Sequence, residues 1–263
     1  EIEKIISQKV SKKKFSIVSN PEFLREGDAI RDFIYPDRVV VGTNHKKSNK
    51  ILKNLYSPLI SKGAKYVNTS RRAAELIKYS SNAFLATKIT FINELANFCE
   101  KIEVNIEDIS TGMGLDKRIG GRFLRAGPAY GGSCFPKDTK AIVNTADKFN
   151  TNLSIIKSVI KSNESRSALL LKRVFDLLKG KVKNKKICFL GVTFKANTDD
   201  MRDSSSLTMI PSLIKKGAYI NYFDPTGEKN EFKKIKNVNF SDSIKSAIKV
   251  ADLIIIHTEW NDF

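Results

Sequence analysis

The stretch GGSCFPKD, residues 131–138, sets one cysteine between two glycines and a Pro-Lys-Asp run. Pro136 suits the first turn of a helix, so the pattern predicts a tight turn that enters a helix just after Cys134. A cysteine there lies at the positive end of the helix dipole and near Lys137, and both favour the nucleophilic thiolate. Asp138, in the first turn, could orient a water molecule or bond the amides of the loop. The alternative is a small cysteine buried beside a turn for packing, as free cysteines often are.

Glu22 and Glu26 are four residues apart, as are Cys134 and Asp138. They follow Asn20 and Pro21, which can cap and open a short helix, and positions i and i+4 of a helix share one face. We therefore expect both carboxylates to point into one cleft. The alternative is that they only complement the dipole of that first turn.

Lys78 and Asn82 form a third pair with the same spacing. Lys78 lies in a stretch that is otherwise apolar or small, where a lone ammonium group is costly unless it has a partner or a function. A lysine held in place could stabilise an oxyanion. The alternative is a lysine at the helix edge that extends its ammonium group to water.

The composition limits the classes of function. A chain of 263 residues with 41% hydrophobic residues can bury a core of one large or two ordinary domains. The net charge of +18 suits nucleic acid, an anionic membrane or a phosphorylated small substrate. The lysines are scattered, with no basic arm and no zinc-finger spacing, so we expect no nucleic-acid partner. No apolar run approaches the ~20 residues of a membrane span, and the first ten residues lack signal-peptide order, so we expect a cytoplasmic protein with no membrane partner.

The cysteines and histidines predict neither a disulfide framework nor a metal site. Cys99, Cys134 and Cys188 are widely spaced and form no CxxC pair, and His45 and His257 are isolated. Cys99 and Cys188 fall in helical and apolar strand patterns, so we interpret them as packing residues.

Segments with different residue patterns follow one another along the chain. Strand patterns at 15–21, 37–43 and 65–70, with a short helix at 48–59 ended by Ser-Pro, indicate an α/β segment. Residues 71–103 contain no proline or glycine and predict one long helix, and 152–178 predict a second. The seven glycines between 112 and 132 indicate an irregular stretch that allows close backbone approach.

The last third returns to strand and helix patterns. Strands are expected at 185–194, 218–225 and 252–258, with helices at 204–217 and 243–251, the first with a serine N-cap and a glycine stop. This alternation is half of a doubly wound parallel sheet. No GxGxxG occurs in the chain, so no pyrophosphate site is evident by itself.

Six linked motifs resemble the UDP-glucose/GDP-mannose dehydrogenase family, in order, from about Phe15 to the last residue. The motifs are NPEFLREGDAIRDF, PDRVVVG, AELIKYSSNAFLATKITFINE, RIGGRFLRAGPAYGGSCFPKDTKA, GVTFKANTDDMRDS and TEWNDF. The fourth motif, which contains GGSCFPKD, is more similar to the branch that oxidises UDP-glucose than to the GDP-mannose branch. The resemblance implies an α/β fold in which Rossmann-like parallel sheets flank a central all-helical dimerisation region.

The activity that the resemblance implies is a two-step, four-electron oxidation at C6 of UDP-glucose, which uses two NAD⁺ and gives UDP-glucuronate. Cys134 matches the nucleophile that captures the aldehyde as a thiohemiacetal, which a second hydride transfer turns into a thioester. Lys78 matches the lysine that steadies the oxyanion, Asn82 its hydrogen-bonding companion, and Asp138 a residue that serves the hydrolytic water.

The resemblance implies further site positions. Glu22 matches a glutamate for thioester hydrolysis, and Glu26 a glutamate near the sugar and the nicotinamide. Cofactor contacts are implied at Glu26, Lys137 and Arg202. Substrate contacts are implied at Phe23, Leu24, Arg118, Phe123, Leu124, Gly127, Tyr130, Gly131, Phe194 and Lys195, with Arg118 reaching across a homodimer.

By the same resemblance, residues 1–70 would be the C-terminal remnant of an NAD-binding Rossmann domain, 71–180 a central helical domain, and 181–263 an incomplete UDP-binding domain. The family's first strand and glycine-rich loop have no counterpart in this sequence, so we expect an incomplete enzyme that carries the catalytic residues. Two alternatives remain: a non-catalytic fragment that binds a nucleotide sugar or dimerises, and a dehydrogenase for another nucleotide sugar such as GDP-mannose.

Overall fold

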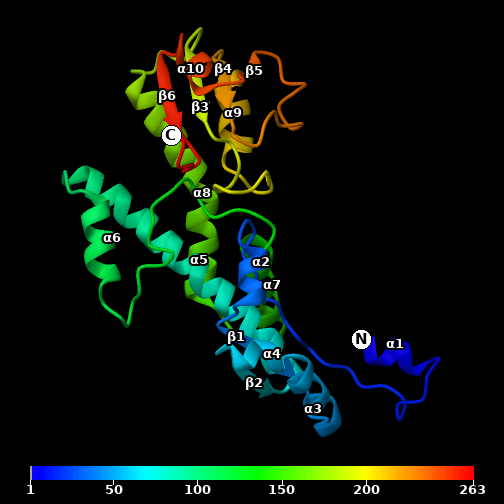
Figure 1. The fold of residues 1–263 in the computed structure, drawn as a ribbon. Coiled ribbons are helices and arrows are strands. Elements are labelled where there is room, and N and C mark those ends of the chain that lie inside the picture. The colour runs from blue at the N-terminus through cyan, green and yellow to red at the C-terminus, as the bar shows by residue number, and fades with distance from the viewer. Residues whose placement is uncertain (1) are drawn as a thin grey trace. The chain divides into compact units, whose positions relative to one another are not determined.

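The computed structural model describes residues 2–263 (Figure 1). The chain forms two compact units, one ending at Ser81 and the other spanning Asn82–Phe263. The boundary falls within helix α5 (Arg71–Lys101). No helix in the described part is both long and apolar enough to cross a membrane.

The first unit is built on two parallel strands. It contains α1 (Ile2–Ser7), α2 (Ala29–Ile34), β1 (Arg38–Gly42), α3 (Lys46–Leu55), α4 (Ser57–Ser61) and β2 (Lys65–Thr69). β1 pairs with β2 in parallel, and Val39 and Val41 pack with Ala64 beneath α3 and α4. The β-branched run of β1 is buried, as expected for a strand covered on both faces.

Two predictions for the start of this unit are wrong. Residues 15–21 form no strand and make only a single antiparallel bridge, Ser19 to Gly42, and no helix begins at Pro21. The reason is Asn20, whose side chain does not cap a helix. Its Nδ2 donates to the Val40 oxygen at 2.8 Å, and its Oδ1 accepts from the Tyr56 hydroxyl. These bonds hold the segment extended beside β1, so Glu22 and Glu26 share no helix face.

The predicted helix at 48–59 is two helices. Pro58 lies in the first turn of α4 and does not end α3, and His45 caps α3 through a bond from the Ser48 amide to its ring. Proline is tolerated at that place because the first N–H groups of a helix have no partner within it.

The second unit continues α5 and adds α6 (Ile106–Gly114), α7 (Phe135–Lys148) and α8 (Ser154–Leu177). The two long helices are confirmed within two residues of their predicted ends. α8 lies beside α5 in Figure 1, and the helices are bridged by Ser162 to Glu94 and Arg173 to Glu100. α6 was not predicted, because it ends in Thr-Gly-Met-Gly, whose glycines are poor helix formers.

A parallel sheet closes the second unit. Its elements are β3 (Lys186–Leu190), α9 (Ser206–Lys215), β4 (Tyr219–Phe223), β5 (Val238–Phe240), α10 (Ile244–Ile248) and β6 (Leu253–Ile256), and the strand order is β5-β4-β3-β6. Ile187 and Phe189 face the core with α8 and α9, while Cys188 and Leu190 face α10. The three predicted strands are confirmed, and the short β5 is additional. The protein is α/β with Rossmann-like parallel sheets.

A serine stands at the N-cap of α9 as predicted, but the hydroxyl that accepts from a helix N–H is that of Ser204, which bonds the Ser206 amide at 3.3 Å. Ser205 at the N-cap makes no capping bond and instead bonds the ring of His257, while Ser204 and Ser206 both donate to the Val192 oxygen. The serines therefore tie the helix to the loop after β3. Gly217, with φ of 84°, ends the helix as predicted.

Candidate active site

Cys134 lies where the sequence predicts, at the start of a helix. It is the N-cap of α7, Pro136 follows in the first turn, and the Asp138 amide donates to the Cys134 oxygen at 2.8 Å. The thiol is free and half-buried, with Sγ 3.5 Å from the Ser133 hydroxyl. The first N–H groups of a helix have no partner within it, so this end of α7 carries a local positive potential.

The two glycines before Cys134 are required by close packing inside the chain. A Cβ on Gly131 would lie 2.6 Å from the Asp203 oxygen, and one on Gly132 would lie 2.7 Å from the ring of Phe194. Gly132 also has a φ of 74° and donates its N–H to the Arg202 oxygen. The cysteine loop therefore packs against the segment that follows β3.

Asp138 and Asn82 form a buried pair beside this cysteine. Asn82 Nδ2, on α5, donates to Asp138 Oδ2 at 2.6 Å, and the two residues are 6% and 2% exposed. Lys137 Nζ lies 3.6 Å from the other carboxylate oxygen, while the rest of its side chain is largely exposed. The carboxylate is thus held by a neutral donor and a cation within one turn of Cys134.

Lys78 has a partner in the first unit. Its Nζ donates to the backbone oxygen of Glu22 at 2.6 Å and to Oε1 of the same residue at 3.0 Å. It also lies over the ring of Phe23, as does the Arg38 guanidinium. This explains how an ammonium group is tolerated in an apolar stretch. Lys78 and Asn82 are one helical turn apart on α5, as predicted.

The predicted substrate positions between residues 118 and 130 differ in burial and in backbone conformation. Leu124 and Tyr130 are buried, and Phe123 has a φ of 66°. Arg118 is 89% exposed and, within the described chain, bonds only Asp116, two residues before it. This chain therefore does not hold Arg118 at the cysteine.

The remaining predicted positions fall on both units. Leu24 and Glu26 lie in the extended and turn segment before α2, and Lys195 and Arg202 in the loop after β3. The Arg202 guanidinium pairs with Asp200 at 2.8 Å.

The sheet order marks a second place where a ligand can bind. From β3 the chain runs to β4 and β5 on one side and then returns to β6 on the other, so the order reverses between β3 and β6. Ligands of such sheets bind outside the carboxyl ends of the strands at this switch point. The loop there is held by Asp224, which accepts from the Val192 amide, and by Thr258, which donates to the Thr193 oxygen.

Three residues of the site were missed by sequence reasoning. Asn93, Asn163 and Arg166 bond the backbone of residues 127 and 130, just before the cysteine. Asn163 and Arg166 are three apart in a predicted helix, so they share a face, but nothing in the sequence tells which backbone they meet. No group of three or more possible metal ligands gathers among residues 2–263.

Comparison with protein families matches three successive parts of the chain. The UDP-glucose/GDP-mannose dehydrogenase family is matched by its NAD binding domain at residues 1–60, its central domain at 72–165 and its UDP binding domain at 188–263. The predicted resemblance is thereby confirmed.

Curated relatives and a solved structure agree with that match. The UDP-glucose 6-dehydrogenase of Rickettsia felis is 51% identical over 95% of this chain and 56% of its own length. That of Rhizobium meliloti is 44% identical over 100% of this chain and 61% of its own length. The structure of a UDP-glucose dehydrogenase from Pyrobaculum islandicum superposes with a TM-score of 0.92 at 33% identity, covering 98% of this chain and 59% of that one. The chain thus spans a little over half the length of these relatives, and it belongs to the UDP-glucose/GDP-mannose dehydrogenase family.

Proposed function

We propose that this chain supplies the catalytic residues for the NAD-dependent oxidation of UDP-glucose to UDP-glucuronate. The observation that carries the proposal is the half-buried Cys134 at the start of α7, one turn from the buried Asp138–Asn82 pair. The names of the relatives support the substrate. A cysteine at a positive helix end is suited to covalent catalysis, because the thiolate is the attacking form.

The chemistry supplied by bound NAD⁺ is hydride acceptance from C6, once in each of two oxidations. The first oxidation also removes the proton of the C6 hydroxyl and leaves an aldehyde. The Cys134 thiolate then attacks this aldehyde, a C–S bond forms and the carbonyl oxygen takes up a proton. The second oxidation removes the C6 hydride and that proton, which leaves a thioester. Water then adds to the acyl carbon and gives up two protons, the C–S bond breaks, and the carboxylate leaves with the thiolate restored.

The polar residues are assigned to the charges that these steps develop. We assign Lys78 to the oxyanion, because its ammonium group is mostly buried and held by Glu22. Asn82 holds Asp138, and this carboxylate is assigned to the hydrolytic water. Glu22 is assigned to thioester hydrolysis and Glu26 to the region of the sugar and nicotinamide, both from the family resemblance.

The residues of this chain fit part of an NAD site. Lys137 and Arg202 present cations suited to a diphosphate, and both side chains are largely exposed. The sequence has no GxGxxG loop, which would supply backbone amides to that diphosphate. These two residues would therefore contact the dinucleotide without forming its whole cradle.

The substrate assignments follow the loops. Phe194 and Lys195 begin the segment at the switch point of the second sheet, where a uridine diphosphate is proposed to bind. Phe23, Leu24, Phe123, Leu124, Gly127, Tyr130 and Gly131 are assigned to the sugar end. Because Leu124 and Tyr130 bury their side chains, their contacts would be made by backbone. We keep the three-domain division at residues 70 and 180 as part of this proposal.

A homodimer is proposed through α5. Phe84, Phe91 and Phe98 are each about half or more exposed and recur every seven residues, so they line one side of the helix. A row of exposed aromatic rings is typical of an interface. Arg118, which is exposed and paired only locally within the described chain, is assigned to the partner's site.

The three free cysteines fit a reducing, cytoplasmic setting.

The test is NADH formation at 340 nm with UDP-glucose and NAD⁺. It is run on this chain and on a longer version joined to the N-terminal glycine-rich segment of a relative, each with Cys134→Ser as its control. Turnover by the longer version that stalls in Cys134→Ser supports the proposal. If the longer version oxidises GDP-mannose instead, the substrate assignment is wrong. If it binds UDP-glucose but oxidises no nucleotide sugar, a binding role replaces the enzymatic one.

A further inference from the structure

Two residues of the loop that leads to Cys134 are held by side chains in place of backbone partners. Asn163, on α8, accepts from the Tyr130 N–H at 2.9 Å through Oδ1 and donates to the Tyr130 oxygen at 3.0 Å through Nδ2. Both backbone groups of Tyr130 are therefore satisfied by one amide. Its ring is buried with Ala86 and Val159, so the residue is held from two sides.

Gly127 is held in the same way by two residues from different helices. Its N–H donates to Asn93 Oδ1 on α5 at 2.8 Å, and its oxygen accepts from Arg166 Nε on α8 at 2.6 Å. Arg166 Nη1 donates to the backbone oxygen of Asn93 and to Oδ1 of Asn97, both on α5. One guanidinium group thus joins α5, α8 and the loop.

Arg166 is unusually placed for a charged residue. It is 6% exposed, and no ion pair is formed by it among residues 2–263. Burial, with the charge of Arg173 nearby, lowers the pKa of Arg166 to about 10, so it stays protonated at neutral pH. A buried guanidinium that meets only neutral oxygens carries a desolvation cost, and its geometric role is to fix those oxygens.

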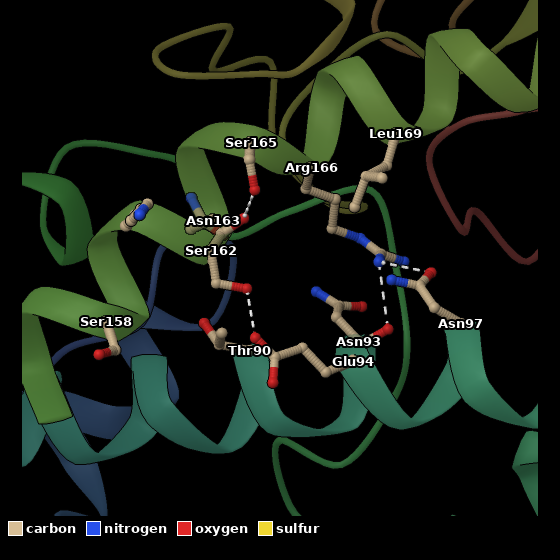
Figure 2. A pocket seen from close by; sticks show the side chains of 11 residues that line it. Thr90, Asn93, Glu94, Asn97, Ser158, Ser162, Asn163, Ser165, Arg166 and Leu169 are labelled. Atoms are coloured by element: carbon tan, nitrogen blue, oxygen red, sulfur yellow. Dashed lines mark hydrogen bonds between the residues drawn. The ribbon is translucent and has the colours of Figure 1, made fainter.

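A groove of about 400 Å³, lined mostly by residues with polar side chains, lies behind these contacts, between α5 and α8 (Figure 2). Asn93 points into it, and its Nδ2 is buried with no hydrogen-bond partner among residues 2–263, as is Thr90 Oγ1. The orientation of the Asn93 amide is nonetheless fixed, because the Gly127 N–H needs an acceptor. Only the oxygen half of Asn93 is used, whereas both halves of Asn163 are used.

We propose that Asn93, Asn163 and Arg166 are positioning residues that set the place of Cys134 through Gly127 and Tyr130. Tyr130 is four residues before Cys134, and the glycines between them are packed against Phe194 and Asp203. The cysteine is therefore fixed from both ends of a short irregular loop. The inference rests on the proposed function only for what Cys134 does, because the clamp itself is measurable without catalysis.

The same substitution at two positions gives the sharpest test. Asn93→Asp keeps the oxygen that accepts from Gly127 and loses an unpartnered donor, and its added negative charge is on a residue whose backbone oxygen already accepts from the Arg166 guanidinium. Asn163→Asp loses the donor to the Tyr130 oxygen and sets a carboxylate against that carbonyl. Ser165→Ala, on the same turn of α8, is the control, since its hydroxyl bonds only its own helix. Asn163→Ala removes both bonds without adding charge, in case the charged variant does not fold.

The measurements are amide hydrogen exchange of the peptide covering residues 123–134, the rate at which iodoacetamide alkylates Cys134, and the thermal midpoint. Cys99 and Cys188 are buried, so native alkylation reports Cys134. We expect Asn163→Asp and Asn163→Ala to speed loop exchange at least tenfold and Cys134 alkylation several-fold. Asn93→Asp and Ser165→Ala should stay within about twofold of the parent. In the active longer version, the Asn163 variants should lower kcat.

The proposal is overturned if the Asn163 variants leave loop exchange and alkylation unchanged, or if Asn93→Asp matches Asn163→Asp. A fall in thermal midpoint without faster loop exchange also overturns it, because that marks a role in global packing alone. These readouts do not need NADH formation, so the clamp and the dehydrogenase assignment can fail separately.

Discussion

Among the three cysteines, the surroundings separate one reactive thiol from two packing residues. Cys188 is fully buried in β3, and burial raises the pKa of its thiol to about 11, while Cys99 is buried in α5. Cys134 alone among the three is half-buried and at a helix start. The expectation that two cysteines serve packing and one serves chemistry follows from these differences.

The Asn82–Asp138 bond is predicted to stabilise the fold as well as the site. Asn82→Ala leaves a buried carboxylate with one fewer donor, so the free energy of unfolding should fall by roughly 1–3 kcal/mol, measured in urea. Asp138→Ala in the same background should then cost less than it does alone, since the pair acts together. Strictly additive losses would show that the two residues do not interact.

His257 is predicted to make stability depend on pH. It is buried between Ser205 and Thr258, and burial lowers the pKa of its imidazole from 6.5 to about 4. Between these values the unfolded state binds a proton that the folded state does not. The contribution of the neutral ring is therefore full above pH 6.5 and is lost as pH falls toward 4, about 3 kcal/mol in all.

The measurement for His257 is the difference in unfolding free energy between the parent and His257→Gln at several pH values. The difference should shrink as pH falls from 7 to 4.5, because the variant carries no titrating group there. A difference that stays constant across this range would contradict a buried neutral histidine.

At the scale of elements, the sequence correctly predicted the helices and turns that depend on residues close together along the chain. The helices at 71–103 and 152–178 and the turn into α7 depend on periodicity, proline and glycine, all visible in sequence. The strand at 15–21 and the helix after Pro21 were predicted wrongly because Asn20 bonds β1 and Tyr56, which are tertiary partners. Neither the Glu22 partner of Lys78 nor the backbone targets of Arg166 could be read from spacing, for the same reason.

The glycines before Cys134 give a prediction at this scale. Gly131→Ala places a Cβ against the Asp203 oxygen and should lower the free energy of unfolding by roughly 1–3 kcal/mol. Gly127→Ala is the matched control, because a Cβ there meets nothing within 4 Å. Chemical denaturation of both variants checks this, and equal losses would mean that the close approach to Asp203 is not what requires glycine.

For the whole molecule, the boundary between the two units falls within α5, between Lys78 and Asn82. The net charge of +18 suits a diphosphate-bearing substrate, which agrees with the family. Sequence motifs identified that family without structure. They did not show how the glycine loop is anchored, since its anchors come from α5 and α8.

Assembly is the prediction that belongs to this scale. Phe91→Glu puts a charge in the middle of the exposed phenylalanine row of α5 and should convert a dimer to a monomer in sedimentation velocity at micromolar concentration. Phe149→Glu is the control, because that ring is also exposed but follows α7 and lies outside the row. A parent chain that sediments as a monomer would overturn the homodimer.

The most direct test of the central claim is the mass of the Cys134 peptide during turnover. The longer, active version with Glu22→Gln, in which hydrolysis should be slow, is mixed with UDP-glucose and NAD⁺, quenched in acid and digested. The account predicts a UDP-glucuronyl thioester on the peptide containing Cys134, absent without NAD⁺ and absent in Cys134→Ser. NADH formation that continues undiminished in Cys134→Ser, with no adduct on the parent peptide, would contradict covalent catalysis by this cysteine.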